Sequence, residues 1–179
     1  MTTDLIRRFT LKARQLLTQE VGDLLEGVYG LRSDGAFEPT RNLPALLELP
    51  EAGKTRKQLE CFLEDEESAG LSRRDAYAKL LKETAFTHLN RLVAFKMMEA
   101  RGLRRGVLDK HQDSNEFLFY LADATHAGDY GLYQQGSFPQ DALGEGPRDR
   151  AYRHFLLWLC GQTAQEIKVL FDPGNLPSR

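Results

Sequence analysis

The sequence predicts an all-α fold: an irregular bundle of about five or six helices around a long central helix over about 73–101. Two observations carry this prediction. Apolar residues recur at steps of three and four along most of the chain, which is the spacing of an amphipathic helix. No stretch of four or more residues alternates cleanly between apolar and polar types with an excess of β-branched residues, so no strand is expected.

The first predicted helix covers residues 3–29. Leu5, Phe9 and Leu16 begin a series of apolar residues at helical spacing, and a threonine at position 2 or 3 can cap its start. The pattern is that of a long amphipathic helix.

A loop is predicted over about 30–53, where Gly, Pro, Asn and Asp interrupt the periodic pattern. Its one apolar piece, LPALLEL, allows at most one turn of helix. A short second helix is predicted from Thr55 through the acidic run at 64–67, ending before Gly70.

The central helix is predicted to begin at a capping box. Ser72 and Asp75 have the required spacing, and the apolar pattern then continues without Gly or Pro as far as Gly102. Because apolar residues lie on most sides of this helix, we expect it to be buried.

The later helices are predicted from similar signals. Asp113 or Ser114 caps one helix, and another ends at Gly161. Between them, a polar stretch over about 128–148 holds five glycines and two prolines, which predicts a loop. With 179 residues, the chain has the size of a single helical domain, 1–179.

Composition excludes some classes of partner for the molecule as a whole. The formal net charge is −2 and the pI is about 6.1, so any basic surface must be local. Cys61 and Cys160 lie far apart without CxxC or Cys/His spacing, which predicts reduced thiols. The absence of a leader pattern and of a long apolar run predicts a cytoplasmic protein with no membrane partner.

No motif in the chain predicts a catalytic, cofactor-binding or metal site. The triplet GKT at 53–55 ends like a phosphate-binding loop, but Glu48 stands where that motif needs a glycine, and Pro50 lacks an N–H. The triplet EIK at 166–168 resembles the metal-binding strand of DNA-cleaving nucleases. It opens a short helix with a capping box at Thr163, so a solvated first turn is the better interpretation. The four histidines form no pair at metal-binding spacing.

Three polar residues interrupt the apolar pattern of the central helix: His88, Asn90 and Arg91. A guanidinium buried alone is unfavourable by several kcal/mol, so Arg91 needs a carboxylate, helix-end carbonyls or an external anion such as phosphate. We interpret the three residues as a structural clasp in which Asn90 satisfies a loop or helix end and Arg91 pairs with an acidic side chain. Contact of Arg91 with phosphate or a partner protein stays open.

The end of the central helix is the one locally basic stretch. Its cations can follow a DNA backbone, where each Lys or Arg adds salt-dependent affinity that does not depend on sequence. They can also form a solvated face, balanced by Glu99, Asp109 and the acidic run at 64–67. The candidate DNA contacts are Lys96, Arg101, Arg104, Arg105 and Lys110.

Residues 86–99, FTHLNRLVAFKMME, followed by Gly102 and Leu103, resemble a helix near the N-terminus of large adenine-specific DNA methyltransferases. The shared pattern is an aromatic residue, Asn-Arg, an alanine between apolar residues, a basic residue, two apolar residues and a glutamate. The family includes fused restriction–methylation enzymes and the methyltransferases of bacteriophage-exclusion defence systems. The tail LFDP at 170–173 is similar to the segment by which that region runs toward the catalytic core.

The resemblance implies an α-helical N-terminal region beside a core that uses S-adenosylmethionine to methylate adenine after flipping the base. The cofactor loop and the Asn-Pro-Pro-aromatic motif of that core are absent from this sequence. The chain is therefore expected to be an excised, non-catalytic domain that contacts double-stranded DNA or supports the methyltransferase core. The alternative is a helical protein-interaction module that docks another subunit of a defence complex through an apolar helix face.

Overall fold

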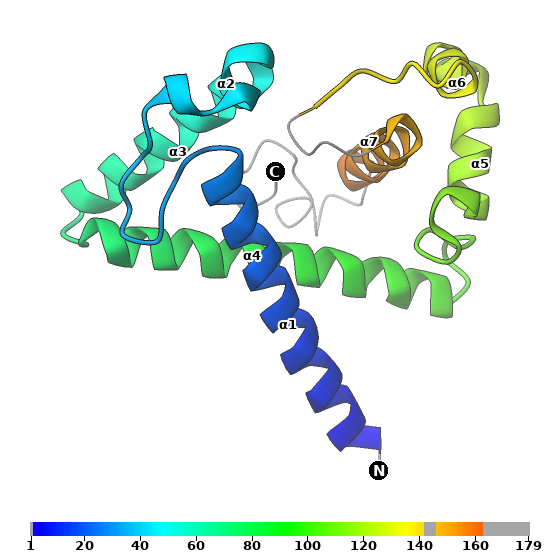
Figure 1. Ribbon diagram of the computed structural model, residues 1–179. Helices are drawn as coiled ribbons and strands as arrows, with labels where there is room; N and C mark the ends of the chain where they lie inside the picture. The colour runs from blue at the N-terminus through cyan, green and yellow to red at the C-terminus, as the bar shows by residue number, and fades with distance from the viewer. Residues whose placement is uncertain (1, 142–145, 163–179) are drawn as a thin grey trace. The chain divides into compact units, whose positions relative to one another are not determined.

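The computed structural model describes residues 2–141 and 146–162, and these residues form helices without a β-strand. The all-α prediction is therefore confirmed. Figure 1 labels the α-helices as α1 (Thr2–Gly27), α2 (Pro44–Glu48), α3 (Pro50–Ser68), α4 (Arg73–Ala100), α5 (Asn115–Ala122), α6 (Ala127–Gln134) and α7 (Pro147–Gly161). The last predicted helix, the EIK triplet at 166–168 and the tail at 170–173 lie outside the described residues.

The chain divides into two compact units, whose described residues are 2–89 and, for the second, 90–141 and 146–162. Helix α4 contributes its first part to one unit and its last part to the other. Each unit has a hydrophobic core of its own. The single domain expected over 1–179 stays a prediction, because compact units of one chain can unfold together or separately.

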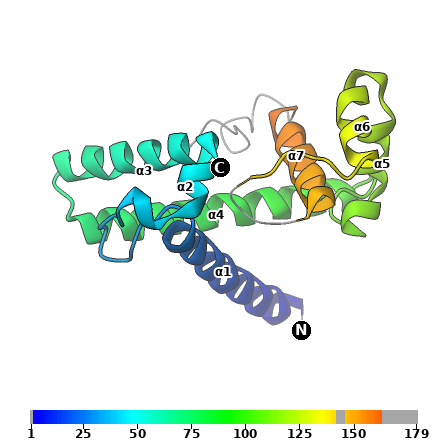
Figure 2. The same cartoon turned by 45° about the horizontal axis from the view of Figure 1, so that its top comes forward.

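The first unit is built on the hairpin of α3 and α4, onto which the second half of α1 packs. Gly70, at φ +99°, ends α3 and lets the chain reverse into α4 (Figure 2). The predicted cap at Ser72 is confirmed, because the Asp75 N–H donates to Ser72 Oγ at 3.2 Å. The reciprocal contact runs between the side chains: the Ser72 hydroxyl donates to the Asp75 carboxylate at 2.6 Å. The buried core consists of Val21, Leu25, Leu31, Leu59, Leu63, Ala76, Tyr77 and Leu80.

The second unit gathers α5, α6 and α7 around the end of α4, and aromatic rings fill much of its core. The Phe117 ring lies edge-on to the rings of Tyr133 and Tyr152, with 5.5 Å between centroids in both pairs. The Tyr152 hydroxyl donates to the Val107 carbonyl at 2.8 Å, which ties the segment after α4 to α7. The buried core consists of Phe95, Val107, Phe117, Tyr120, Leu121, Phe138, Ala151, Tyr152, Phe155, Leu159 and Cys160.

The loop predicted at about 128–148 is wrong in its first part, because α6 covers Ala127–Gln134. Two glycines in AGDYGLYQ hide this helix, since glycine costs a helix about 1 kcal/mol relative to alanine. Tertiary contacts outweigh that cost: Leu132 and Tyr133 pack against the core, and the Tyr120 hydroxyl donates to the Asp129 carboxylate.

The loop predicted at about 30–53 is also shorter than expected. Helix α2 lies inside it and is close to the single turn allowed for LPALLEL, whereas α3 begins at Pro50 instead of Thr55. Both helices have proline in their first turn, where its missing N–H is not needed and its fixed φ suits a helix. Proline in these positions starts helices, whereas the sequence pattern predicted a loop there.

Candidate functional site

One face of α4 is exposed, contrary to the expectation that this helix is buried on most sides. The exposed fractions are 59% for Phe86, 41% for Val93 and 48% for Met97. These residues follow one another at steps of seven and four, so they share one side of the helix. We call them the α4 face. An exposed apolar row on a long helix is typical of a surface that binds another protein.

The three residues of the expected clasp are at least partly covered. Arg91 is only 4% exposed, whereas His88 and Asn90 are half-buried. Burial raises the pKa of the Cys160 thiol, and the nearby positive charge of Arg91 opposes that shift. The expected burial of Arg91 is confirmed, and its clasp with His88 and Asn90 stays a prediction.

His88 also lines a small cavity in the first unit, together with side chains of α1, α3 and other positions of α4. The volume is about 50 Å³. Apart from the Tyr29 hydroxyl, its polar side chains come from Thr55, Thr84 and His88. Because small-molecule sites span about 300–1,000 Å³, this space suits water and not a cofactor.

Two of the five candidate DNA-contacting residues form ion pairs with acidic side chains. Lys96 Nζ lies 2.7 Å from Glu99 and also pairs with Asp109. Arg104 Nη1 lies 2.9 Å from Glu116 Oε1. Within the described ranges, this leaves a smaller set of exposed cations without a carboxylate partner: Arg101, Arg105 and Lys110.

Arg105 has a different neighbour. Its guanidinium lies over the Phe119 ring, 4.2 Å from the centroid, and its backbone N–H donates to Glu116 at 3.2 Å. The stacked ring holds the side chain in place and leaves its charge exposed. The structure thus brings the predicted cations into one segment but neutralises part of it.

Glu99 organises the segment that follows α4. Its carboxylate accepts hydrogen bonds from the backbone N–H groups of Val107 and Leu108, the latter at 2.6 Å, and from Lys96 at 2.7 Å. Burial alone would raise the pKa of Glu99, but the bond from Lys96 and the two backbone N–H groups lower it below the ordinary value. Glu99 therefore stays charged, as a connector of α4 to this segment.

A second buried guanidinium, which the sequence patterns did not single out, belongs to Arg56 in α3. It is 8% exposed. Each of its three nitrogens donates a hydrogen bond: Nη1 to the Tyr29 carbonyl at 2.7 Å, Nη2 to the Glu38 carbonyl at 2.9 Å and Nε to Glu60 at 2.7 Å. The Phe37 ring lies 4.4 Å from its central carbon. Arg56 thus fastens the loop after α1 to α3.

This arrangement also bears on the neighbouring GKT triplet. Residues 53–55 lie inside α3, whereas a phosphate-binding loop precedes its helix. The only sequence signal for Arg56 was its i, i+4 spacing to Glu60, which is common on solvated helices.

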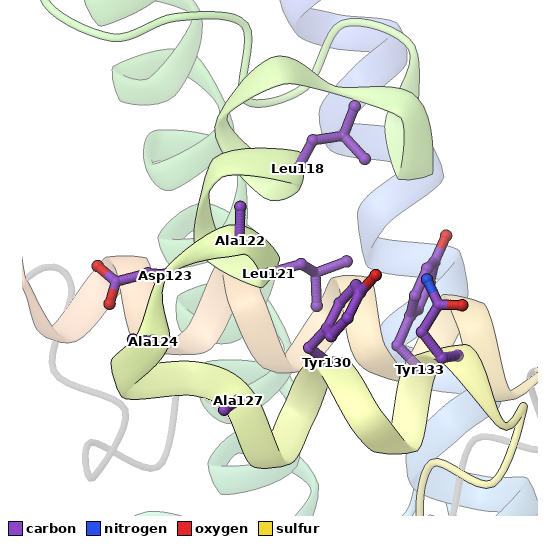
Figure 3. Close-up of a pocket in the computed structure, with 9 residues that line it drawn as sticks. Leu118, Leu121, Ala122, Asp123, Ala124, Ala127, Tyr130 and Tyr133 are labelled. Carbon is purple, nitrogen blue, oxygen red and sulfur yellow. The ribbon is translucent and has the colours of Figure 1, made fainter.

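A cleft lies in the second unit, with walls from α5, α6 and the turn between them (Figure 3). Its volume is about 540 Å³. Small and apolar side chains line most of it, and Figure 3 shows the Asp123 carboxylate pointing away from Leu121 and the rings of Tyr130 and Tyr133. Asp123 accepts hydrogen bonds from the N–H and hydroxyl of Thr125, so it caps the turn. No charged group of the cleft is positioned for chemistry.

Two histidines lie beside a polar cluster on the second unit. The Tyr120 hydroxyl donates to Asp129, and His154 Nε2 lies 3.4 Å from the same carboxylate. His126 stacks on the Tyr120 ring at 4.0 Å between centroids. Burial and the bond to Asp129 raise the pKa of Tyr120, so its phenol remains a hydrogen-bond donor. The cluster joins α5, α6 and α7.

Among the described residues, no three His, Cys, Asp or Glu side chains come together as metal ligands. Within the same ranges, no helix combines the length and apolar character needed to cross a membrane. No protein-family model, curated protein or solved structure matches the chain.

Proposed function

We propose that this chain is a non-catalytic helical domain of an S-adenosylmethionine-dependent DNA adenine methyltransferase. Its role is to support the catalytic core, and the α4 face is the surface that docks there. The single observation that carries the proposal is the exposure of Phe86, Val93 and Met97 on the helix whose sequence resembles the methyltransferase family.

Burial explains why this face suits a folded protein. Covering a large apolar side chain at an interface contributes about 1.5–3 kcal/mol. The α4 face places three such side chains in one row on a helix that is continuous from Arg73 to Ala100. An apolar row of this kind on a helix fits a groove on a partner domain.

Contact with DNA is the weaker part of the proposal. Its support is the exposed charge of Arg101, Arg105 and Lys110, and the pairing of Lys96 and Arg104 with carboxylates counts against it. We place duplex contact second, as an electrostatic addition to docking.

The test measures binding of the full chain to the purified methyltransferase core by calorimetry. Val93→Ser and Met97→Ser should each weaken binding about tenfold, because each removes apolar area from the contact. Leu47→Ser is the matched control, since Leu47 is an exposed apolar residue (65%) on a different helix, α2. Unchanged circular dichroism would show that the variants fold.

The alternative, a module that docks another subunit of a defence complex, uses the same surface with a different partner. This alternative is supported if the α4 variants leave binding to the core unchanged and abolish binding to that subunit. Binding to neither protein would contradict both forms of the proposal.

A further inference from the structure

The first half of α1 carries an exposed apolar row that the first unit does not cover. Leu5, Phe9 and Leu16 are 63%, 65% and 57% exposed, and they lie within about 40° of one another at 100° per residue. The second half of the same side is polar and exposed, with Glu20, Asp23 and Gly27. This side of α1 is therefore open from Leu5 to Gly27, a length of about 33 Å.

Charge is divided between the two halves of α1. The first half holds four bases, Arg7, Arg8, Lys12 and Arg14, against one acid, Asp4. The second half holds three acids, Glu20, Asp23 and Glu26, and no base. Along the border of the exposed side, the order is Arg8, Lys12, Gln15, Gln19, Asp23 and Glu26.

We propose that α1 is the interface with a second copy of this chain, which lies antiparallel to the first. With the two-fold axis near residue 17, Arg8 of one copy lies across from Glu26 of the other, and Lys12 lies across from Asp23. Gln15 and Gln19 then face one another. The border sequence is its own complement when reversed, which is the requirement for an isologous two-fold contact.

The apolar row fits this register. Leu16 meets Leu16 of the second copy near the axis. Phe9 lies level with the gap between Asp23 and Gly27 of the second copy, and the open space around Gly27 leaves room for the ring. Because of the symmetry, each pairing between two different residues occurs twice, whereas the Leu16 contact occurs once.

Other occupants fit less well. A parallel pair of α1 helices would set bases beside bases, and like charges across an interface are unfavourable. DNA would pair with the bases but would leave Leu5, Phe9 and Leu16 uncovered. The ion pair between Arg8 and Asp4 within α1, at 3.1 Å, is exposed on both sides and easily exchanged.

Sedimentation equilibrium of the full chain tests the proposal. A two-helix contact is small, so we expect a dimer with a dissociation constant on the order of 10 µM at low salt that weakens about tenfold in high salt. Phe9→Ser should weaken the dimer about tenfold or more. Leu11→Ser is the matched control, because Leu11 is 56% exposed on the opposite side of α1.

Charge reversals test the antiparallel register. Lys12→Glu should weaken the dimer about tenfold, and so should Asp23→Lys, whereas the double variant should recover it because both changes restore complementary pairs. Arg7→Glu, on the far side, should have no effect. A chain that stays monomeric at about 200 µM overturns the proposal. So does equal weakening by Leu11→Ser and Phe9→Ser, or failure of the double variant to recover association.

Discussion

Arg56 holds the first unit together through main-chain carbonyls, and this determines what its loss would do. The carbonyls of Tyr29 and Glu38 receive their hydrogen bonds from the guanidinium, so a shorter side chain leaves them without these donors. Leaving a buried polar group unsatisfied costs about 1–3 kcal/mol, so the loss at this site exceeds that of an ordinary surface ion pair.

We expect Arg56→Met to lower the free energy of unfolding by about 3 kcal/mol, measured by urea denaturation. Lys54→Ala is the control, because the Lys54 and Glu51 side chains are 68% and 78% exposed and their ion pair contributes about 0–1 kcal/mol. Equal effects of the two substitutions would show that Arg56 is not the fastening residue.

Glu99 makes stability depend on pH. Its pKa is lowered in the folded chain, so its contribution is complete above the unfolded-state pKa near 4.5 and is lost as the pH falls through the lower folded value. Glu99→Gln should lower the free energy of unfolding by about 1–3 kcal/mol at neutral pH. The difference in stability from the parent chain should shrink on acidification through that pH window. Thermal midpoints of the variant and the parent chain, measured from neutral pH down through this pH window, test the prediction. A difference that does not change with pH would contradict the role of the charge.

At the scale of elements, two glycines should respond in opposite ways to substitution by alanine: one lies in α6 and the other in the loop after α1. Gly131 lies inside α6, and a methyl group on its Cα would meet open space, so Gly131→Ala should raise the free energy of unfolding by about 0.5–1 kcal/mol. Gly30 has φ +65°, and a methyl group there would collide with Leu43 and lie 3.3 Å from Arg56 Nη1. Gly30→Ala should therefore destabilise the chain by more than about 1 kcal/mol. Opposite signs in the two thermal midpoints are the expected result.

The same two elements show where sequence patterns fail. The helical period placed α1, α4 and α7 well, because long periodic segments and capping residues are local signals. Helix α6 was missed because its stability comes from Tyr133 and Asp129 contacts with residues elsewhere in the chain. The apolar pattern of α4 predicted burial on most sides, and it did not show that Phe86 and Met97 are left uncovered.

The candidate site residues also divide into those with local sequence signals and those that depend on contacts elsewhere in the chain. The burial of Arg91 could be predicted, because its helix is rich in apolar residues. Arg56 could not, since its partners are carbonyls of a loop with no sequence signature. The pairing of Lys96 was within reach of the sequence, because Glu99 lies three residues away and Asp109 was expected to balance the basic stretch. The pairing of Arg104 was not, because Glu116 reaches it only once the segment after α4 has folded back.

For the whole molecule, the balance of charge limits what DNA binding can be. The net charge is −2, and part of the basic segment is paired with carboxylates. We expect the chain alone to bind duplex DNA weakly. If Arg101, Arg105 and Lys110 each contact one phosphate, the logarithm of the affinity falls with the logarithm of salt with a slope of about −3. Fluorescence anisotropy with a labelled duplex at several salt concentrations measures this slope.

Substitutions then separate the open cations from the paired ones. Arg101→Gln should reduce the slope by about one with little change in stability, because this exposed side chain has no acidic partner among the described residues. Lys96→Gln should lower stability through Glu99 and leave the slope unchanged. A slope near about −5 that falls with Lys96→Gln would mean that the carboxylates release their partners on DNA, and duplex contact would then outrank docking as the function of this segment.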